Sequence, residues 1–419
     1  MRIAAFHAMK KFLVLVLMIL PVALRAQDGN ISRDELIFKY DLNEKNKKID
    51  PTKFYFTEKI DIEHTPVINQ TGAGTCWSYA TNSFIESEMM RMGKKPYELS
   101  RIYSLRCAFK ERAESFVRMR GGIAWGEGGE CHDVLNMYTM YGAIPESVYP
   151  GPVTHITTRQ IEEMTKALKA FLNKVIDDPQ SDLAQHWRQA FDAIMDSYIG
   201  DAPDKFNFDE HNYNPATFGK KVVGIHPEDY IELGSVINRP LYSEMTLLVP
   251  DNWEFNRVYN IKMDEITDVI DRALSRGFTV AWEADITEQY FNWERGIAYV
   301  PEKDVKNMTA EERSTMFDGP KFERYISPEI RQTALDKMET TDDHAMHIVG
   351  MAEDQNHKKY YKVKNSWDTN NEYAGYIYVT KTYVKFKTST ILLHKSALSV
   401  EMRNKLNLGT TGNSRVFYR

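Results

Sequence analysis

The stretch that decides the fold is residues 70–88, which read QTGAGTCWSYATNSFIESE. It passes from a loop with two glycines into a segment that contains neither Gly nor Pro. The apolar residues of that segment recur at helical spacing: Trp77, Ala80, Phe84 and Ile85. The spacing predicts a helix that begins at Cys76. Because a helix N-terminus carries partial positive charge and free N–H donors, this position favours a thiolate over a thiol.

A cysteine at this position has two interpretations, a nucleophile or a small buried side chain of an ordinary helix. A thiol nucleophile needs a base within hydrogen-bond reach and a group that orients the base. Two later motifs offer such groups, TDDHAMH at 341–347 and KNSWD at 364–368. We therefore predict that Cys76 is the nucleophile, that a histidine of the first motif is the base and that Asn365 orients it.

Two further side chains fit the same chemistry. Gln70 can donate its side-chain N–H, together with the backbone N–H of Cys76, to the oxyanion of a tetrahedral intermediate. Trp367 is expected to cover the hydrogen bond between the histidine and Asn365 and to exclude water from it. The predicted reaction is attack of the thiolate on a peptide carbonyl, followed by hydrolysis of the thioester, and it requires no cofactor.

The motifs Gln-x5-Cys-Trp, His-Ala-Met and Asn-Ser-Trp, in this order, resemble those of the papain family of cysteine peptidases. Within the family, the chain is similar to the bleomycin hydrolase and aminopeptidase C branch over most of residues 60–395. The resemblance implies a papain-like α+β fold with a helical half, a β-rich half and a large, mostly helical insertion. It also implies that His344, not His347, is the catalytic histidine. Contact with the substrate is implied for Gly128, Gly129, Trp77 and Trp367.

We expect four segments along the chain. Residues 1–26 are predicted to be a secretory signal peptide, because two lysines precede an apolar core and small residues that end at Ala26. An uncleaved anchor is the alternative, but the apolar run is short for a membrane span. The other three segments are an N-terminal arm with the helical half, the helical insertion and the β-rich half, at 27–150, 151–255 and 256–419. The protein is therefore predicted to be exported, to the periplasm or outside the cell, without a stable membrane anchor.

The composition argues against several partners and cofactors. The net charge is −6, which does not suit nucleic-acid binding, because that binding depends on Lys and Arg at phosphates. The three cysteines cannot form a disulfide scaffold; Cys107 and Cys131 form either one bridge or two buried thiols, and buried thiols are favoured. His132 beside Cys131 suggests a pair of metal ligands, but no second pair at ligand spacing accompanies it. No metal is therefore predicted.

The specificity is left open by the sequence. The resemblance implies an aminopeptidase and a homo-oligomer, the hexamer of this branch, with C-terminal residues in the active-site cleft. The tail of this chain, GTTGNSRVFYR at 409–419, differs from the apolar tail of the branch. The alternatives are an endopeptidase with an open cleft, a transferase with the same triad, and a non-catalytic papain-like binding module. Peptides are the expected partners. Three roles are open for Asp342 and Asp343. They belong to a solvated loop, which is favoured, or they tune the pKa of His344, or they bind a positively charged group of the substrate.

Overall fold

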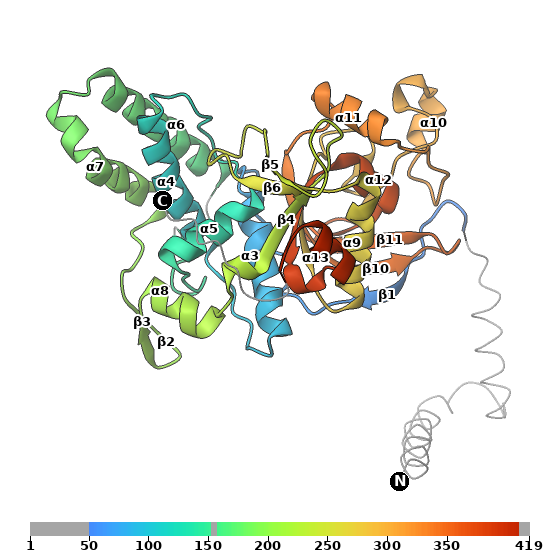
Figure 1. Cartoon of the computed structure of the whole chain (residues 1–419), viewed down its shortest axis with the longest axis horizontal. Helices are drawn as coiled ribbons and strands as arrows, with labels where there is room; N and C mark the ends of the chain where they lie inside the picture. Colours follow the sequence, from blue (N-terminus) through green and yellow to red (C-terminus); the bar gives the residue numbers. More distant parts are fainter. Residues whose placement is uncertain (1–49, 152–156, 410–419) are drawn as a thin grey trace, which may run out of the picture. The chain divides into compact units, whose positions relative to one another are not determined.

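The structure is a computed structural model that describes residues 50–151 and 157–409. Every helix and strand labelled in Figure 1 belongs to one compact unit that starts at Phe54. The predicted signal peptide and the tail residues 410–419 lie outside the described residues.

Helices dominate the first part of this unit. Strand β1 (Thr57–Asp61) precedes a series of five helices: α3 (Cys76–Arg91), α4 (Arg101–Arg118), α5 (Cys131–Tyr141), α6 (Thr158–Asp177) and α7 (Asp182–Ile199). The helix predicted to begin at Cys76 is confirmed. Helix α4 begins where the hydroxyl oxygen of Ser100 accepts the Tyr103 N–H at 3.0 Å, which satisfies one of the free donors of the first turn.

The end of α5 requires a glycine. Gly142 has a φ angle of +82°, a conformation that favours glycine. A Cβ atom at this position would lie 2.2 Å from the carbonyl oxygen of Pro215. Pro215 opens the short helix α8 (Pro215–Phe218), which follows the hairpin of β2 (Phe206–Phe208) and β3 (His211–Tyr213). The glycine thus lets the end of α5 approach α8 closely.

One large sheet forms the second part of the unit. Its strands lie in the order β5-β6-β4-β13-β7-β10-β11-β12-β9-β8, and β1 also pairs with β10. The strands that follow the hairpin are β4 (Tyr230–Gly234), β5 (Glu244–Thr246), β6 (Arg257–Asn260), β7 (Val280–Ala284), β8 (Phe291–Asn292), β9 (Ile297–Ala298), β10 (His344–Glu353), β11 (Lys359–Lys364), β12 (Tyr376–Thr380) and β13 (Thr388–His394). The helices of this part are α9 (Met263–Ser275), α10 (Ala310–Ser314), α11 (Pro328–Asp336), α12 (Lys381–Lys387) and α13 (Val400–Lys405).

The register of the central strands brings the two late sequence motifs together. Strands β10 and β11 are antiparallel, with His347 opposite Lys364. His344 is the first residue of β10, and Asn365 directly follows the last residue of β11. Because the two strands are antiparallel, both residues lie at the same end of the strand pair. On its other side, β10 pairs with β7, where His344 lies opposite Ala284. The strand ends thus set the positions of the predicted base and its orienting group.

Two apolar cores support this arrangement, one among the helices and one on the sheet. Figure 1 shows α4, α5, α6 and α7 in one half of the unit, and α9, α11, α12 and α13 beside the sheet in the other. Helix α3 packs against α4 and α5 and also against β7 and β10. Most of its side chains are buried, including the charged Glu86 and Glu88. It is therefore a central helix, enclosed by protein on several faces.

The range predicted to be a helical insertion, 151–255, has a mixed structure. Helices α6 and α7 occupy its first half, in the region where helical periodicity is strong. Strand β4 then pairs with β13, and β5 extends the same edge through β6. The large sheet therefore begins before residue 256, where the β-rich half was predicted to start. These strands are short and lie among Asp, Asn, Gly and Pro, so their alternation is hard to recognise in the sequence.

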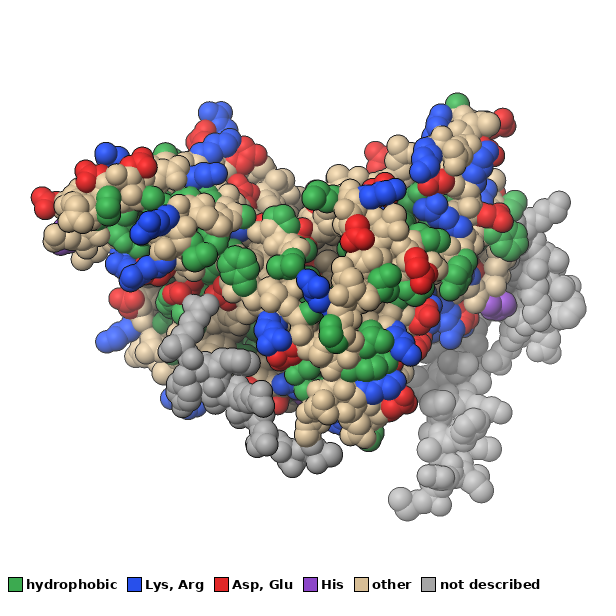
Figure 2. All heavy atoms as spheres, turned by 45° about the horizontal axis from the view of Figure 1, so that its top comes forward, with side chains coloured by type: hydrophobic (Ala, Val, Ile, Leu, Met, Phe, Trp, Pro, Cys, Tyr) green, Lys and Arg blue, Asp and Glu red, His purple; other side chains and the backbone are tan. Residues whose placement is uncertain are grey.

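The surface of the described part carries charges of both signs. Figure 2 shows Lys and Arg side chains mixed with Asp and Glu over the face in view, without a large area of one sign. Among the described residues, no helix combines the length and hydrophobicity that a membrane crossing requires.

Candidate active site

The predicted nucleophile, Cys76, is the first residue of α3 and is half-buried. The loop before it is held by a hydrogen bond from the Gly74 N–H to the Glu127 carboxylate, at 2.8 Å. The backbone N–H groups of Ala345, in β10, and of Trp77, in α3, act on the thiol. The sulfur thus lies where the N-terminal end of α3 meets the start of β10.

The predicted base and its orienting residue are in direct contact. His344 donates its Nε2–H to Oδ1 of Asn365 at 2.7 Å. The same Oδ1 accepts the backbone N–H of Ser366 at 2.8 Å, which identifies this atom as the amide oxygen. Both side chains are buried. Because Nε2 carries the proton in the neutral ring, Nδ1 is the nitrogen free to accept a proton from the thiol.

Trp367 lies beside the histidine as predicted. The centroids of the Trp367 and His344 rings are 4.9 Å apart and the ring planes are tilted by 41°. Trp293 and Phe291 contact the other edges of the indole at centroid distances of 5.2 and 6.0 Å. The tryptophan therefore reduces solvent access to the histidine ring and is itself fixed by aromatic neighbours.

A cavity of about 350 Å³ brings the predicted nucleophile and base together. Its walls contain Cys76 and His344 and also the predicted substrate-binding residues Gly128 and Gly129. The remaining lining residues are Gly74, Gly126, Glu127, Thr165, Asp251, Glu283, Asp342, Asp343 and Ala345. Five of the lining side chains are carboxylates, and none is Lys or Arg. The cavity is therefore suited to a ligand that carries positive charge.

Taken separately, Cys76 and His344 are each more stable in the neutral form than in the charged form. Burial raises the pKa of the Cys76 thiol to about 12, although the N–H groups of Ala345 and Trp77 lower it in part. Burial also lowers the pKa of His344 to about 4, against the hydrogen bond to Asn365, which raises it. A lone thiolate or a lone imidazolium is thus unfavourable. The two charges form together, when the proton moves from sulfur to Nδ1 and each charge stabilises the other.

The loop of residues 126–129, which we call the glycine loop, is held in place by a buried arginine. Arg112 is buried and donates from Nε to the carbonyl of Ala124 and from Nη1 to those of Gly126 and Gly128. A Cβ atom on Gly128 would lie 1.8 Å from a carboxylate oxygen of Asp251, so a larger residue at this position would displace that side chain. The loop therefore presents its backbone to the cavity.

Trp77 differs from its predicted role in substrate contact. Its side chain is 1% exposed and is not among the residues that line the cavity. The indole N–H donates to the Glu127 carbonyl at 2.9 Å, and a Cβ atom on Gly129 would lie 2.9 Å from the indole ring. Trp77 thus supports the glycine loop from the core. Trp367 is likewise absent from the cavity wall and acts on His344.

Gln70, the predicted oxyanion donor, is buried beside the residue that follows Asn365. Its Oε1 accepts the hydroxyl of Ser366, its backbone N–H donates to the Ser366 carbonyl, and its Nε2 donates to the carbonyl of Ala73. These contacts fix the amide and leave its second N–H for another acceptor. Its role as an oxyanion donor stays a prediction.

The second histidine of the motif has a different environment. His347 is buried, and its Nδ1 lies 2.9 Å from the hydroxyl of Ser83, on α3. Burial and the nearby Lys364 lower the pKa of His347 well below its usual value. It therefore contributes to the packing of α3 against β10.

Several residues of the site region were not singled out by the sequence, among them Arg112, Asp251 and Glu283. Arg112 supports the loop, while Asp251 and Glu283 line the cavity. They come from α4, from the segment before β6 and from β7, so no local motif joins them. The alternative of two buried thiols is confirmed, because Cys107 and Cys131 are both free and buried.

Comparison with known proteins agrees with this geometry. The sequence profile of the Peptidase C1-like family matches residues 30–411. The chain therefore belongs to the Peptidase C1-like family, and it is a cysteine peptidase with a papain-like fold.

Individual relatives match most of the chain at low identity. Aminopeptidase C of Lactobacillus delbrueckii subsp. lactis is 23% identical, over 91% of this chain and 90% of the relative. Aminopeptidase C of Streptococcus thermophilus is 24% identical, over 83% and 84% of the two chains. A crystal structure of pepw from Lactobacillus rhamnosis covers 90% of this chain and 95% of its own, with 21% identity and a TM-score of 0.66.

Proposed function

We propose that the protein is an exported cysteine aminopeptidase, which removes residues from the amino end of peptides through a Cys76 thioester. The thiolate attacks the carbonyl carbon of the scissile bond, while Gln70 and the Cys76 N–H stabilise the oxyanion. The His344 imidazolium gives its proton to the leaving amine, and the C–N bond breaks. Neutral His344 then takes a proton from water, which attacks the thioester and releases the acid.

The observation that carries the aminopeptidase proposal is the charge of the cavity. Its lining holds Glu127, Asp251, Glu283, Asp342 and Asp343 without a basic side chain. A peptide with a free amino terminus brings an ammonium group close to the first scissile bond. Carboxylates at the cavity wall attract this group and do not attract an acetylated terminus. The names of the relatives, aminopeptidases C, support the same specificity.

The test compares two forms of each peptide in one series, with free and with N-acetylated amino termini. Using the full chain, we expect kcat/KM to be about 100-fold higher for the free peptides, which corresponds to about 2.7 kcal/mol. The variants Asp251→Asn and Asp342→Asn are expected to reduce this ratio, because each removes one carboxylate from the cavity wall. The matched control is Asp204→Asn, an exposed position outside the cavity, which should leave the ratio unchanged.

Other outcomes separate the alternatives. Equal cleavage of free and acetylated peptides would show an endopeptidase with an open cleft. Products that contain an added amine nucleophile would show a transferase. Binding of peptides without cleavage would show a binding module.

Export is the second part of the proposal and rests on residues 1–26, with two lysines, an apolar core and small residues before Gln27. In a Gram-negative host, we expect the full chain to be recovered from the periplasmic or extracellular fraction, shortened at its amino end. A chain that lacks residues 1–26 should stay in the cytoplasm. Recovery of both forms from the cytoplasm would contradict export.

A further inference from the structure

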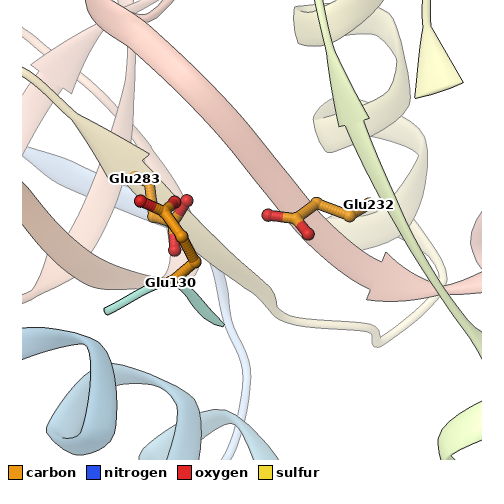
Figure 3. A group of neighbouring side chains, drawn as sticks. All are labelled: Glu130, Glu232 and Glu283. Atoms are coloured by element: carbon orange, nitrogen blue, oxygen red, sulfur yellow. The ribbon is translucent and has the colours of Figure 1, made fainter. Parts of the chain in front are cut away.

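Three buried glutamates gather next to the cavity, although they are far apart in the sequence. Glu130 precedes α5, Glu232 lies in β4 and Glu283 in β7, and they are 1%, 7% and 3% exposed. One carboxylate oxygen from each lies within 4.8 Å of the others. Figure 3 shows the carboxylates of Glu130 and Glu283 next to each other, with that of Glu232 pointing towards them. We call this group the glutamate cluster.

The hydrogen bonds of the cluster are incomplete. Glu283 accepts the backbone N–H of Cys131, and Glu232 lies 2.6 Å from Nδ1 of His132. The hydroxyl of Thr390 lies near both glutamates, at 2.7 Å from Glu232 and 2.5 Å from Glu283, but it has one hydrogen to donate. Neither oxygen of Glu130 has a hydrogen-bond donor among the described residues. Glu130 is thus a buried polar side chain, aimed at two other carboxylates, without a partner of its own.

Such a cluster is unfavourable unless its charge is compensated. A buried carboxylate that lacks both a donor and a counter-charge is strongly destabilising. Against the effect of burial, the Glu232 carboxylate raises the pKa of His132 to about 10, so this imidazolium compensates one of the three carboxylates and leaves the charge of the other two to be compensated. Carboxylate oxygens are the ligands of hard divalent cations, and Ca²⁺ takes oxygens at about 2.3–2.6 Å, so two ligands of one ion lie at most about 5 Å apart. The separation of up to 4.8 Å within the cluster fits this limit.

We propose that Glu130, Glu232 and Glu283 together bind one divalent cation of the Ca²⁺ type, next to the active-site cavity. Glu283 belongs both to the cluster and to the cavity wall, which gives the ion a route from solvent. The ion would join three segments that already share hydrogen bonds: the start of α5, β4 and β7. Cys131 and His132 are not ligands in this proposal, since they hydrogen-bond to the glutamates themselves.

The experiment measures binding and stability rather than hydrolysis. The full chain carrying Cys76→Ala is treated with EDTA, freed of the chelator and titrated with CaCl2, MgCl2 or MnCl2 in a calorimeter. We expect one Ca²⁺ per chain and a Tm that rises by about 2 °C or more in saturating CaCl2. Because this variant is expected to be inactive, the result does not depend on the proposed peptidase activity.

Two variants connect the binding to the cluster. Glu130→Gln keeps the shape of the side chain and removes its charge, so Ca²⁺ should bind at least about tenfold more weakly and the Ca²⁺-dependent rise in Tm should disappear. Without Ca²⁺, the same variant should be at least as stable as its parent, because an uncompensated buried charge is gone. The matched control is Glu302→Gln, at an exposed position, which should bind Ca²⁺ as the parent does.

Two results would overturn the proposal. One is the absence of binding and of any Tm shift with all three cations. It would mean that the glutamates share protons among themselves. The other is unchanged Ca²⁺ binding by Glu130→Gln, which would place the ion elsewhere on the chain.

Discussion

Replacing Cys76 with Ala is expected to reduce kcat/KM for peptide hydrolysis by more than about 10,000-fold. The substitution removes the sulfur that forms the thioester, and no other cysteine, serine or threonine side chain is predicted to replace it. Thr165 also lines the cavity, but no base is assigned to its hydroxyl. The measurement is kcat/KM for a peptide with a free amino terminus, with folding checked by circular dichroism and by Tm.

The control for this prediction is the same chemical change outside the cavity. Cys107 is a free cysteine buried in the helical core, and Cys107→Ala removes a thiol without changing the site. It should retain activity, with a modest loss of stability. Full activity of Cys76→Ala would contradict the proposed mechanism as a whole. Equal losses in both variants would point to damage to the fold.

Replacing Glu86 with Ala is expected to lower the free energy of unfolding by about 3–5 kcal/mol. The fully buried Glu86 carboxylate accepts three hydrogen bonds, from the Thr65 hydroxyl, the Leu99 N–H and Nη2 of Arg101. Without it, the ion pair that remains for the buried Arg101 guanidinium among the described residues is the weaker one with Glu146, at 3.7 Å. Chemical denaturation followed by tryptophan fluorescence measures the change.

Glu98→Ala provides the comparison. Glu98 lies twelve positions further along the chain and is exposed, so its loss should change the stability by less than about 0.5 kcal/mol. A loss below about 1 kcal/mol for Glu86→Ala would mean that water or a rearranged Arg101 replaces the carboxylate, and that the pair is less important than its burial indicates.

The sequence predicts the parts of the site that are marked by short motifs or by the spacing of neighbouring apolar residues. Cys76 is recognisable because a glycine-containing loop gives way to helical periodicity, and Asn365 because its motif offers a group that orients a base. The choice of His344 over His347 comes from the resemblance to the family. The same reasoning finds the start of α3, which the structure places at Cys76.

The parts that the sequence does not predict depend on contacts between distant segments. Strand β4 is five residues long and lies among turn-forming residues, so only its pairing with β13 makes it part of the sheet. Trp77 is buried because the glycine loop packs against its indole ring. Helical spacing alone does not show which residues will cover the side chain. The glutamate cluster likewise has no signature, because its members belong to three different elements.

The position of α3 between the two cores determines how easily the nucleophile and the base can be separated. The nucleophile belongs to α3 and the base to β10, and these two elements pack directly against each other. Separating sulfur from imidazole therefore means uncovering the buried sides of both cores at once, which resembles global unfolding more than a local fluctuation. The geometry of the catalytic pair is thus tied to the packing of both cores, so the two can be lost only together.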